Sequence, residues 1–167
     1  MALVIARTSS NLCGILTFPV LLNDCNYQSY YTPILLIWFF LDMVGVSFGK
    51  NHLVAQSYKD DGVFFLVYFA TVILFIAKDK IGKWLVITWT SLWFTIQFLC
   101  HEWYTIFNGG IMGNLEGKIE CFSGTMQWFT IKGKYIPDIY HTILHILILL
   151  VIISTFIFIK KSKAKKQ

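Results

Sequence analysis

Four long apolar runs dominate this chain and limit what it can fold into. They cover about residues 32–48, 62–77, 84–106 and 139–159, and polar or charged residues separate them. A helix needs roughly 20 apolar residues to cross a hydrocarbon core of ~30 Å. With 56% hydrophobic residues and a mean hydropathy of +0.63, the chain carries more apolar surface than a water-soluble globule of this length can hide. The sequence therefore predicts four membrane spans.

The apolar runs also indicate the fold class. Their apolarity is continuous rather than strictly alternating, which favours helices over the strands of an outer-membrane barrel. We therefore expect an all-α integral membrane protein, in which residues 32–159 form a four-transmembrane-helix bundle with an outer loop at 108–137. The first span is the shortest and is interrupted by Asp42.

The first 31 residues differ from the rest of the chain. The stretch 12–22 is apolar but short, and it contains Pro19. We interpret residues 1–31 as an interfacial or re-entrant segment. A signal peptide and an extra half-span are the alternatives, although no small-residue cleavage site supports the first of them.

Basic residues predict the orientation. If the chain crosses four times, nine Lys and Arg residues lie on the side of the two termini and five on the other side. The positive-inside rule then places both termini, including the basic tail 160–167, in the cytoplasm. Because these residues sit at membrane edges and do not alternate with aromatics, no nucleic-acid partner is expected. The lipid bilayer is the expected partner, and an oligomer or a larger complex stays open.

Ionisable residues inside the apolar runs are the candidate site. In the last run Asp138, His141 and His145 follow at spacings of three and four, which places them on one helical face. An ionisable side chain is costly to bury in lipid and is therefore suspected of a function.

The third run carries a polar stripe of its own. Its members are Thr90, Gln97, His101 and Thr105, and its outer end reads His101-Glu102-Trp103-Tyr104. Asp42 lies about six residues from the outer end of the first run, which is a depth of ~9 Å at ~1.5 Å per residue. We therefore expect six residues to share the extracytoplasmic third of the bilayer: Asp42, His101, Glu102, Asp138, His141 and His145.

Histidine and carboxylate side chains are typical ligands of a transition metal, and here they are expected at one depth in the membrane. The candidate metal ligands are His101, Glu102, Asp138, His141 and His145, and the candidate residues of a ligand pocket are Asp42, Gln97 and Tyr104. Three alternatives stay open. One histidine from each of two helices could hold a haem, the cluster could move protons on an apolar or lipid-like ligand, or its members could only hold helices together in an accessory or structural protein.

Other signals of chemistry are few. The chain has no Gly-rich phosphate loop, no GxSxG, no HExxH and no tandem repeat, so the sequence leaves open whether it is an enzyme. Its cysteines, Cys13, Cys25, Cys100 and Cys121, form no CxxC pair, which disfavours a disulfide oxidoreductase. We expect all four to be unpaired, although Cys100 and Cys121 both fall near the outer face, where a bridge is allowed.

The outer loop 108–137 is longer than the usual connection of about 4–6 residues. Its second half, 122–135, mixes aromatic residues with Lys132 and Lys134 as an interfacial segment does. We weigh two interpretations, a lid over the polar cluster and a segment lying on the membrane surface. Pro137 then marks the start of the last helix.

Overall fold

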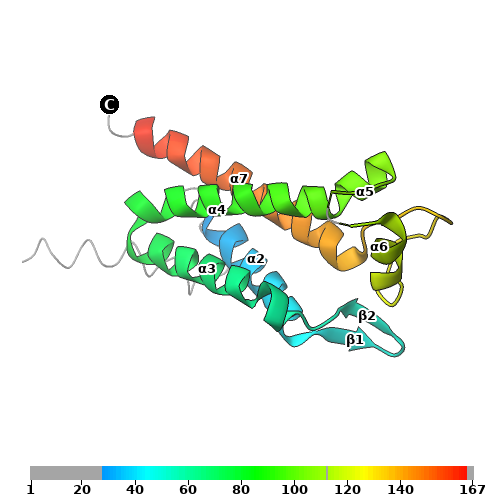
Figure 1. Ribbon diagram of the computed structural model, residues 1–167. Helices are drawn as coiled ribbons and strands as arrows, with labels where there is room; N and C mark the ends of the chain where they lie inside the picture. The colour runs from blue at the N-terminus through cyan, green and yellow to red at the C-terminus, as the bar shows by residue number, and fades with distance from the viewer. Residues whose placement is uncertain (1–27, 112, 165–167) are drawn as a thin grey trace, which may run out of the picture.

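The protein is seen here as a computed structural model, which describes residues 28–111 and 113–164. In this part of the chain four long helices run side by side (Figure 1): α2 (Gln28–Val44), α3 (Tyr58–Ala77), α4 (Asp79–Cys100) and α7 (Ile139–Ala164). Helix α3 packs against α4, α4 against α7, α7 against α2, and α2 against α3. The four helices thus form a closed ring, and the largely helical fold expected from the sequence is confirmed.

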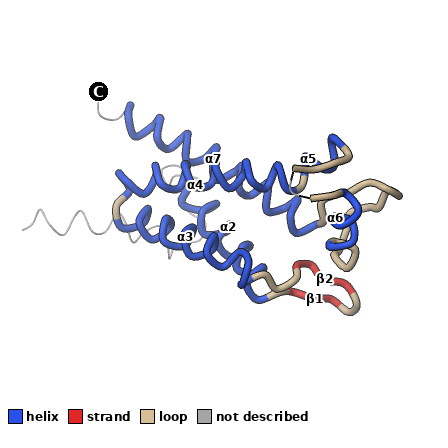
Figure 2. Tube along the Cα trace, in the orientation of Figure 1, coloured by secondary structure: helices blue, strands red, loops and turns tan. Residues whose placement is uncertain are grey.

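The smaller elements gather at one end of the ring, shown at the right of Figures 1 and 2. They are the hairpin of β1 (Val46–Phe48) and β2 (Asn51–Val54), and the short helices α5 (Glu102–Phe107) and α6 (Leu115–Cys121). We call residues 45–57 and 101–138 the cap. The junction between α3 and α4 and the end of α7 lie at the opposite end of the ring.

Aromatic side chains fill the interior of the ring. The Trp93 ring on α4 lies 4.4 Å from that of Phe39 on α2 and 5.7 Å from that of Tyr68 on α3, measured between centroids. Tyr140 on α7 stacks on Trp38 of α2 at 5.5 Å. Trp38 Nε1 donates to the Tyr140 carbonyl at 3.2 Å, and the Tyr140 hydroxyl donates to the Trp38 carbonyl at 3.3 Å. These bonds fix the level at which α7 meets α2.

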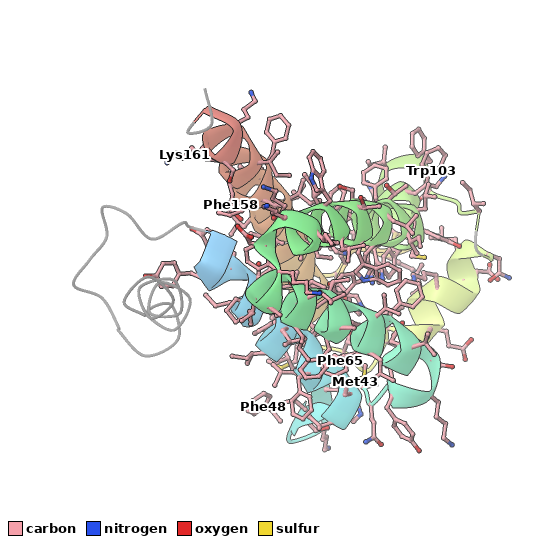
Figure 3. All side chains as sticks on the ribbon, turned by 90° about the vertical axis from the view of Figure 1, so that its left-hand side faces the viewer. Met43, Phe48, Phe65, Trp103, Phe158 and Lys161 are labelled. Carbon is pink, nitrogen blue, oxygen red and sulfur yellow. The ribbon has the colours of Figure 1, made fainter. Side chains whose placement is uncertain are left out.

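Two helices in the described part of the chain are long and apolar enough to cross a membrane, α3 and residues Ile139–Ser162 of α7. Helix α2 is shorter, with 17 residues, and α4 has 22 residues but carries the polar stripe of the third run. Apolar side chains project outward around the ring, as Figure 3 shows from the end opposite the cap. Only 17% of the most apolar part of α3 and 39% of that of α7 are buried inside the fold.

The first predicted span, 32–48, is wrong at its end. Gly45 adopts φ +72° and its N–H donates to the Leu41 carbonyl at 2.8 Å, which closes helix α2. The chain then folds back as the two-stranded hairpin, turning at Gly49 with φ +64°. The all-α fold predicted from the sequence did not include this hairpin. Hydropathy alone could not reveal it, because the apolar run continues across the end of the helix.

The bounds of the other predicted spans also differ from those of the helices in the structure. The third, 84–106, is two helices, since the backbone breaks at His101 with φ −124° and ψ −68°. The second, 62–77, begins earlier, at Tyr58, so that two aspartates occupy its first turn, where the helix dipole favours negative charge. The fourth, 139–159, begins where predicted but continues to Ala164, so the basic tail starts as helix.

The predicted N-terminal segment 1–31 falls largely outside the described residues. Residues 28–31 already belong to α2. Cys13 and Cys25 also lie outside the described part.

Candidate functional site

Three histidines meet where the ring of helices joins the cap. The rings of His101, at the end of α4, and His141, in the first turn of α7, stack with centroids 4.2 Å apart and planes 24° apart. The ring of His145, one turn further along α7, lies 5.5 Å from that of His101 and 6.4 Å from that of His141. Two helices that are far apart in the sequence therefore build one imidazole cluster.

His141 and His101 are each held through Nδ1. The Nδ1 atom of His141 lies 2.8 Å from Asp138 Oδ1, and that of His101 lies 2.5 Å from the Tyr135 hydroxyl. No described residue hydrogen-bonds to the Nε2 atom of either ring. A carboxylate at Nδ1 fixes the tautomer and the orientation of an imidazole and raises its basicity at Nε2. Both rings thus keep one nitrogen for another molecule.

Asp138 combines a structural and an electrostatic task. Its Oδ1 atom also accepts from the backbone N–H of His141 at 2.8 Å, so that Asp138 is the N-cap of α7. The residue is fully buried, and its other oxygen, Oδ2, has no hydrogen-bond partner among the described residues. Because an unsatisfied buried acceptor costs about 1–3 kcal/mol, a donor on a ligand would be stabilised here.

His145 is arranged differently. Its Nδ1 atom bonds to Glu102 Oε1 of α5, and its Nε2 atom lies 3.4 Å from Gln97 Oε1 of α4. Both ring nitrogens are therefore occupied, and the ring ties α7 to α4 and α5. The geometry gives His145 a clearer structural task than His141.

A cavity of about 320 Å³ lies beside His101 and His141. Its apolar wall comes from Val54, Phe64, Trp93, Ile96 and Phe122. The ionisable side chains around it are Asp42, Asp61, His101, Lys118, Asp138 and His141. A space of this size, lined by both apolar and polar side chains, can hold a small molecule or one end of a larger molecule.

Two further carboxyl groups border this cavity. Asp42 is buried near the end of α2, and Asp61 lies in the first turn of α3. The cavity is therefore lined by acidic side chains as well as by the two imidazoles.

The predicted site residues separate into two groups in the structure. Lining the cavity are Asp42, Gln97, His101, Asp138 and His141. Three others stand behind the wall: Glu102, Tyr104 and His145. Tyr104 is buried, and its hydroxyl donates to the Gly113 carbonyl at 3.1 Å.

Three residues were not predicted from the sequence: Asp61 and Lys118, which line the cavity, and Tyr135, which bonds to His101. Asp61 resembled a charge that merely flanks a span, and Lys118 and Tyr135 lie in a loop without periodicity. One signal could have indicated Asp61. It is a carboxylate in the first turn of a helix, and that helix begins at the end of the bundle where Asp42 lies.

The outer loop covers the cavity in part. Residues Lys118, Phe122 and Thr125 line it, whereas Trp128 and Phe129 are exposed. Backbone hydrogen bonds join the loop to the hairpin and to α7. The N–H of residue 52 in the hairpin donates to the carbonyl of residue 124, and the N–H of residue 126 donates to the carbonyl of residue 52. The N–H of residue 139 in α7 donates to the carbonyl of residue 126. Residues of the loop therefore border the cavity, while its roles as a lid and as a surface-lying segment both stay predictions.

The described cysteines are unpaired. Cys100 and Cys121 are both free, as expected, and both lie at the cavity.

A metal role for the cluster stays a prediction. Within residues 28–111 and 113–164, no group of three or more His, Cys, Asp or Glu side chains is placed to hold a metal ion. The stacked rings of His101 and His141 are in direct contact, which leaves no space for a porphyrin between them. No protein-family model, curated protein or solved structure matches this chain.

Proposed function

We propose that this chain is a small multi-pass membrane protein whose capped end binds an amphiphilic, lipid-like ligand and exchanges a proton with its polar group. The observation that carries the proposal is that His101 and His141, whose Nε2 atoms have no hydrogen-bond partner among the described residues, both line a cavity with apolar as well as polar walls. The polar group of the ligand would meet the imidazoles, and its apolar part would lie against Trp93 and Phe64.

The distribution of apolar side chains supports the membrane location. The core helices of a water-soluble protein are mostly buried, whereas only 17% of the most apolar part of α3 and 39% of that of α7 are buried inside the fold. Exposed apolar residues occur on all four long helices, for example Ile37, Leu66, Leu92 and Ile153. A hydrocarbon environment stabilises such a surface, so we propose that α2, α3, α4 and α7 are the four spans.

The orientation can be tested by labelling. The lysines of the α3–α4 junction and the end of α7 lie opposite the cap, so the positive-inside rule places the cap outside. Single cysteines at Lys80 and Lys132, in a cysteine-free background, should label from opposite sides with an impermeant maleimide. In intact cells only the Lys132 site should react, and both should react after permeabilisation. Labelling of both sites in intact cells would contradict the four-span orientation.

The chemistry at His141 follows from its partners. When Nδ1–H donates to Asp138, the lone pair of Nε2 is free to accept a hydrogen bond from a hydroxyl of the ligand. When His141 is protonated instead, the carboxylate at 2.8 Å stabilises the imidazolium, which can donate to an acceptor on the ligand. His101 stacks on the same ring and also lines the cavity. The two imidazoles can therefore accept from and donate to one polar group.

Binding of a neutral amphiphile tests this proposal. We expect full-length protein in a neutral detergent to bind a monoacylglycerol saturably, and we expect His141→Gln to weaken the affinity about tenfold, which corresponds to ~1.4 kcal/mol. His52→Gln is the matched control, because His52 is also in the cap but is exposed and bonds to Ser47. Wild-type affinity in His141→Gln would contradict the role of this residue.

The metal alternative has its own readout. Elemental analysis of the same purified protein would detect a stoichiometric transition metal. A metal that is lost in His141→Gln and retained in His52→Gln would favour the metal site over the acid–base site.

A purely structural role is the second candidate, and the geometry of His145 favours it for that residue. With both ring nitrogens bonded across helices, His145 has the contacts of a tie between α7, α5 and α4. The two roles can coexist, since His145 stands behind the cavity wall whereas His101 and His141 form part of it.

A further inference from the structure

Lys118 of α6 enters the cavity wall inside a cage of aromatic rings. Its Nζ atom lies 4.6 Å from the ring centroid of Phe122, 5.4 Å from that of Tyr135 and 5.6 Å from that of Tyr104. Among the described residues no carboxylate oxygen lies within 4.0 Å of Nζ. The rings therefore position the ammonium group without neutralising it.

No carboxylate forms a direct ion pair with this ammonium group, although the charges of Asp138 and Glu102 favour its protonated form from a greater distance. Cation–π contacts stabilise it, but they do not replace the water that burial removes. Burial accordingly lowers the pKa of Lys118 from its ordinary value. An anion that entered the cavity would stabilise the charged lysine.

The cage also connects Lys118 to the histidines. Tyr135 contributes a ring to the cage, and its hydroxyl bonds to Nδ1 of His101 at 2.5 Å. An anion on Lys118 and a group in contact with His101 would therefore be neighbours on one ligand. Phe122 strengthens the connection, since its ring lies 5.4 Å from that of His101 and 5.3 Å from that of His141.

The carboxyl groups of the cavity leave room for an anion. Asp138 is paired with His141, so its charge is compensated when that imidazole is protonated. Lys118 belongs to α6 in the cap, whereas Asp42 and Asp61 belong to α2 and α3 in the ring. The cation thus stands on a different element from the acidic pair.

We propose that Lys118 binds a phosphate group, so that the ligand of this cavity is a phosphate-bearing molecule whose adjoining polar group meets His101 and His141. This inference rests on the proposed function, since it assigns the polar end of the same ligand. Lysine is a common point-charge partner of phosphate. The phosphate can belong to a lipid headgroup or be free, and the experiment separates these sources.

Two amphiphiles that differ only by a phosphate test the inference, namely a monoacylglycerol and the lysophosphatidic acid with the same acyl chain. Full-length wild type in neutral detergent should bind the phosphate-bearing member at least tenfold more tightly. Lys118→Gln should remove this preference, and Lys118→Arg should retain most of it because the positive charge stays. Lys132→Gln is the matched control, since Lys132 is an exposed lysine of the same cap. Thermal unfolding of each variant verifies that it is folded.

Inorganic phosphate identifies the source. Competition by inorganic phosphate that disappears in Lys118→Gln would support binding of the free anion, whereas a preference without such competition would support a lipid headgroup.

The inference would be overturned if wild type bound both amphiphiles equally, or if Lys118→Gln kept the preference. In those cases binding of the neutral amphiphile would leave the proposed function intact. Wild type that bound neither amphiphile would overturn the proposed function and the phosphate site together.

Discussion

Alanine in place of Gly82 should destabilise the fold by about 3 kcal/mol, at the upper end of the cost of overpacking. Gly82 is buried in the first turns of α4, where the one-residue connection brings α4 against the end of α3. A Cβ atom at this position would lie 2.1 Å from Phe75 Cα and 2.4 Å from Phe75 N. Because these are backbone atoms, no side-chain rotation relieves the clash, and the two helices must separate.

Thermal unfolding in detergent measures this effect, as a decrease in the unfolding temperature of roughly 6–12 °C for a chain of this size. Gly62→Ala is the matched control. Gly62 lies in α3 with nothing within 4 Å of the added Cβ, so alanine should stabilise the helix by up to ~1 kcal/mol. An unchanged unfolding temperature for Gly82→Ala would mean that α3 and α4 do not approach as closely as described.

Two substitutions of Asp138 should separate its structural task from its electrostatic one. Alanine removes the N-cap of α7, at a cost of about 1–2 kcal/mol, and also the partner of His141. Asparagine is as good an N-cap as aspartate but carries no charge, so stability should stay within ~0.5 kcal/mol of wild type. Both variants should bind the monoacylglycerol about tenfold more weakly, because neither stabilises an imidazolium at His141.

Calorimetric titration and thermal unfolding of the same samples measure the two quantities. Asparagine that kept the wild-type affinity would show that Asp138 acts only as a helix cap. Equal losses of stability in both variants would show instead that the charge itself supports the fold.

Depth along the helices was enough to predict that His101 and His141 lie close together. His101, Asp138 and His141 could be placed because each lies near an end of an apolar run, and run ends on one side of a bundle share a level. The same argument could not rank the histidines. His145 lies deeper than His141, yet its two ring nitrogens are bonded by Gln97 and Glu102, and those bonds depend on how α4 and α5 are turned.

The cap was much less predictable. The hairpin after Gly45 interrupts a run that hydropathy treats as continuous, and a turn depends on backbone conformation rather than on apolarity. Lys118 reaches the cavity and Tyr135 reaches His101 because α6 and the loop fold back over the ring, and no periodic pattern encodes those tertiary contacts. From the sequence, Asp61 could be recognised only as a charge beside a span. The structure adds that α2 ends next to it.

Nitrogen-15 NMR of the four histidines of the full-length protein tests the central claim most directly, because the claim concerns two ring nitrogens. Single His→Gln variants assign the signals. When monoacylglycerol is added, the Nε2 signals of His101 and His141 should shift saturably, whereas those of exposed His52 should stay unchanged. If neither His101 nor His141 responds while the ligand binds, the ligand lies elsewhere and the cluster is not the binding site.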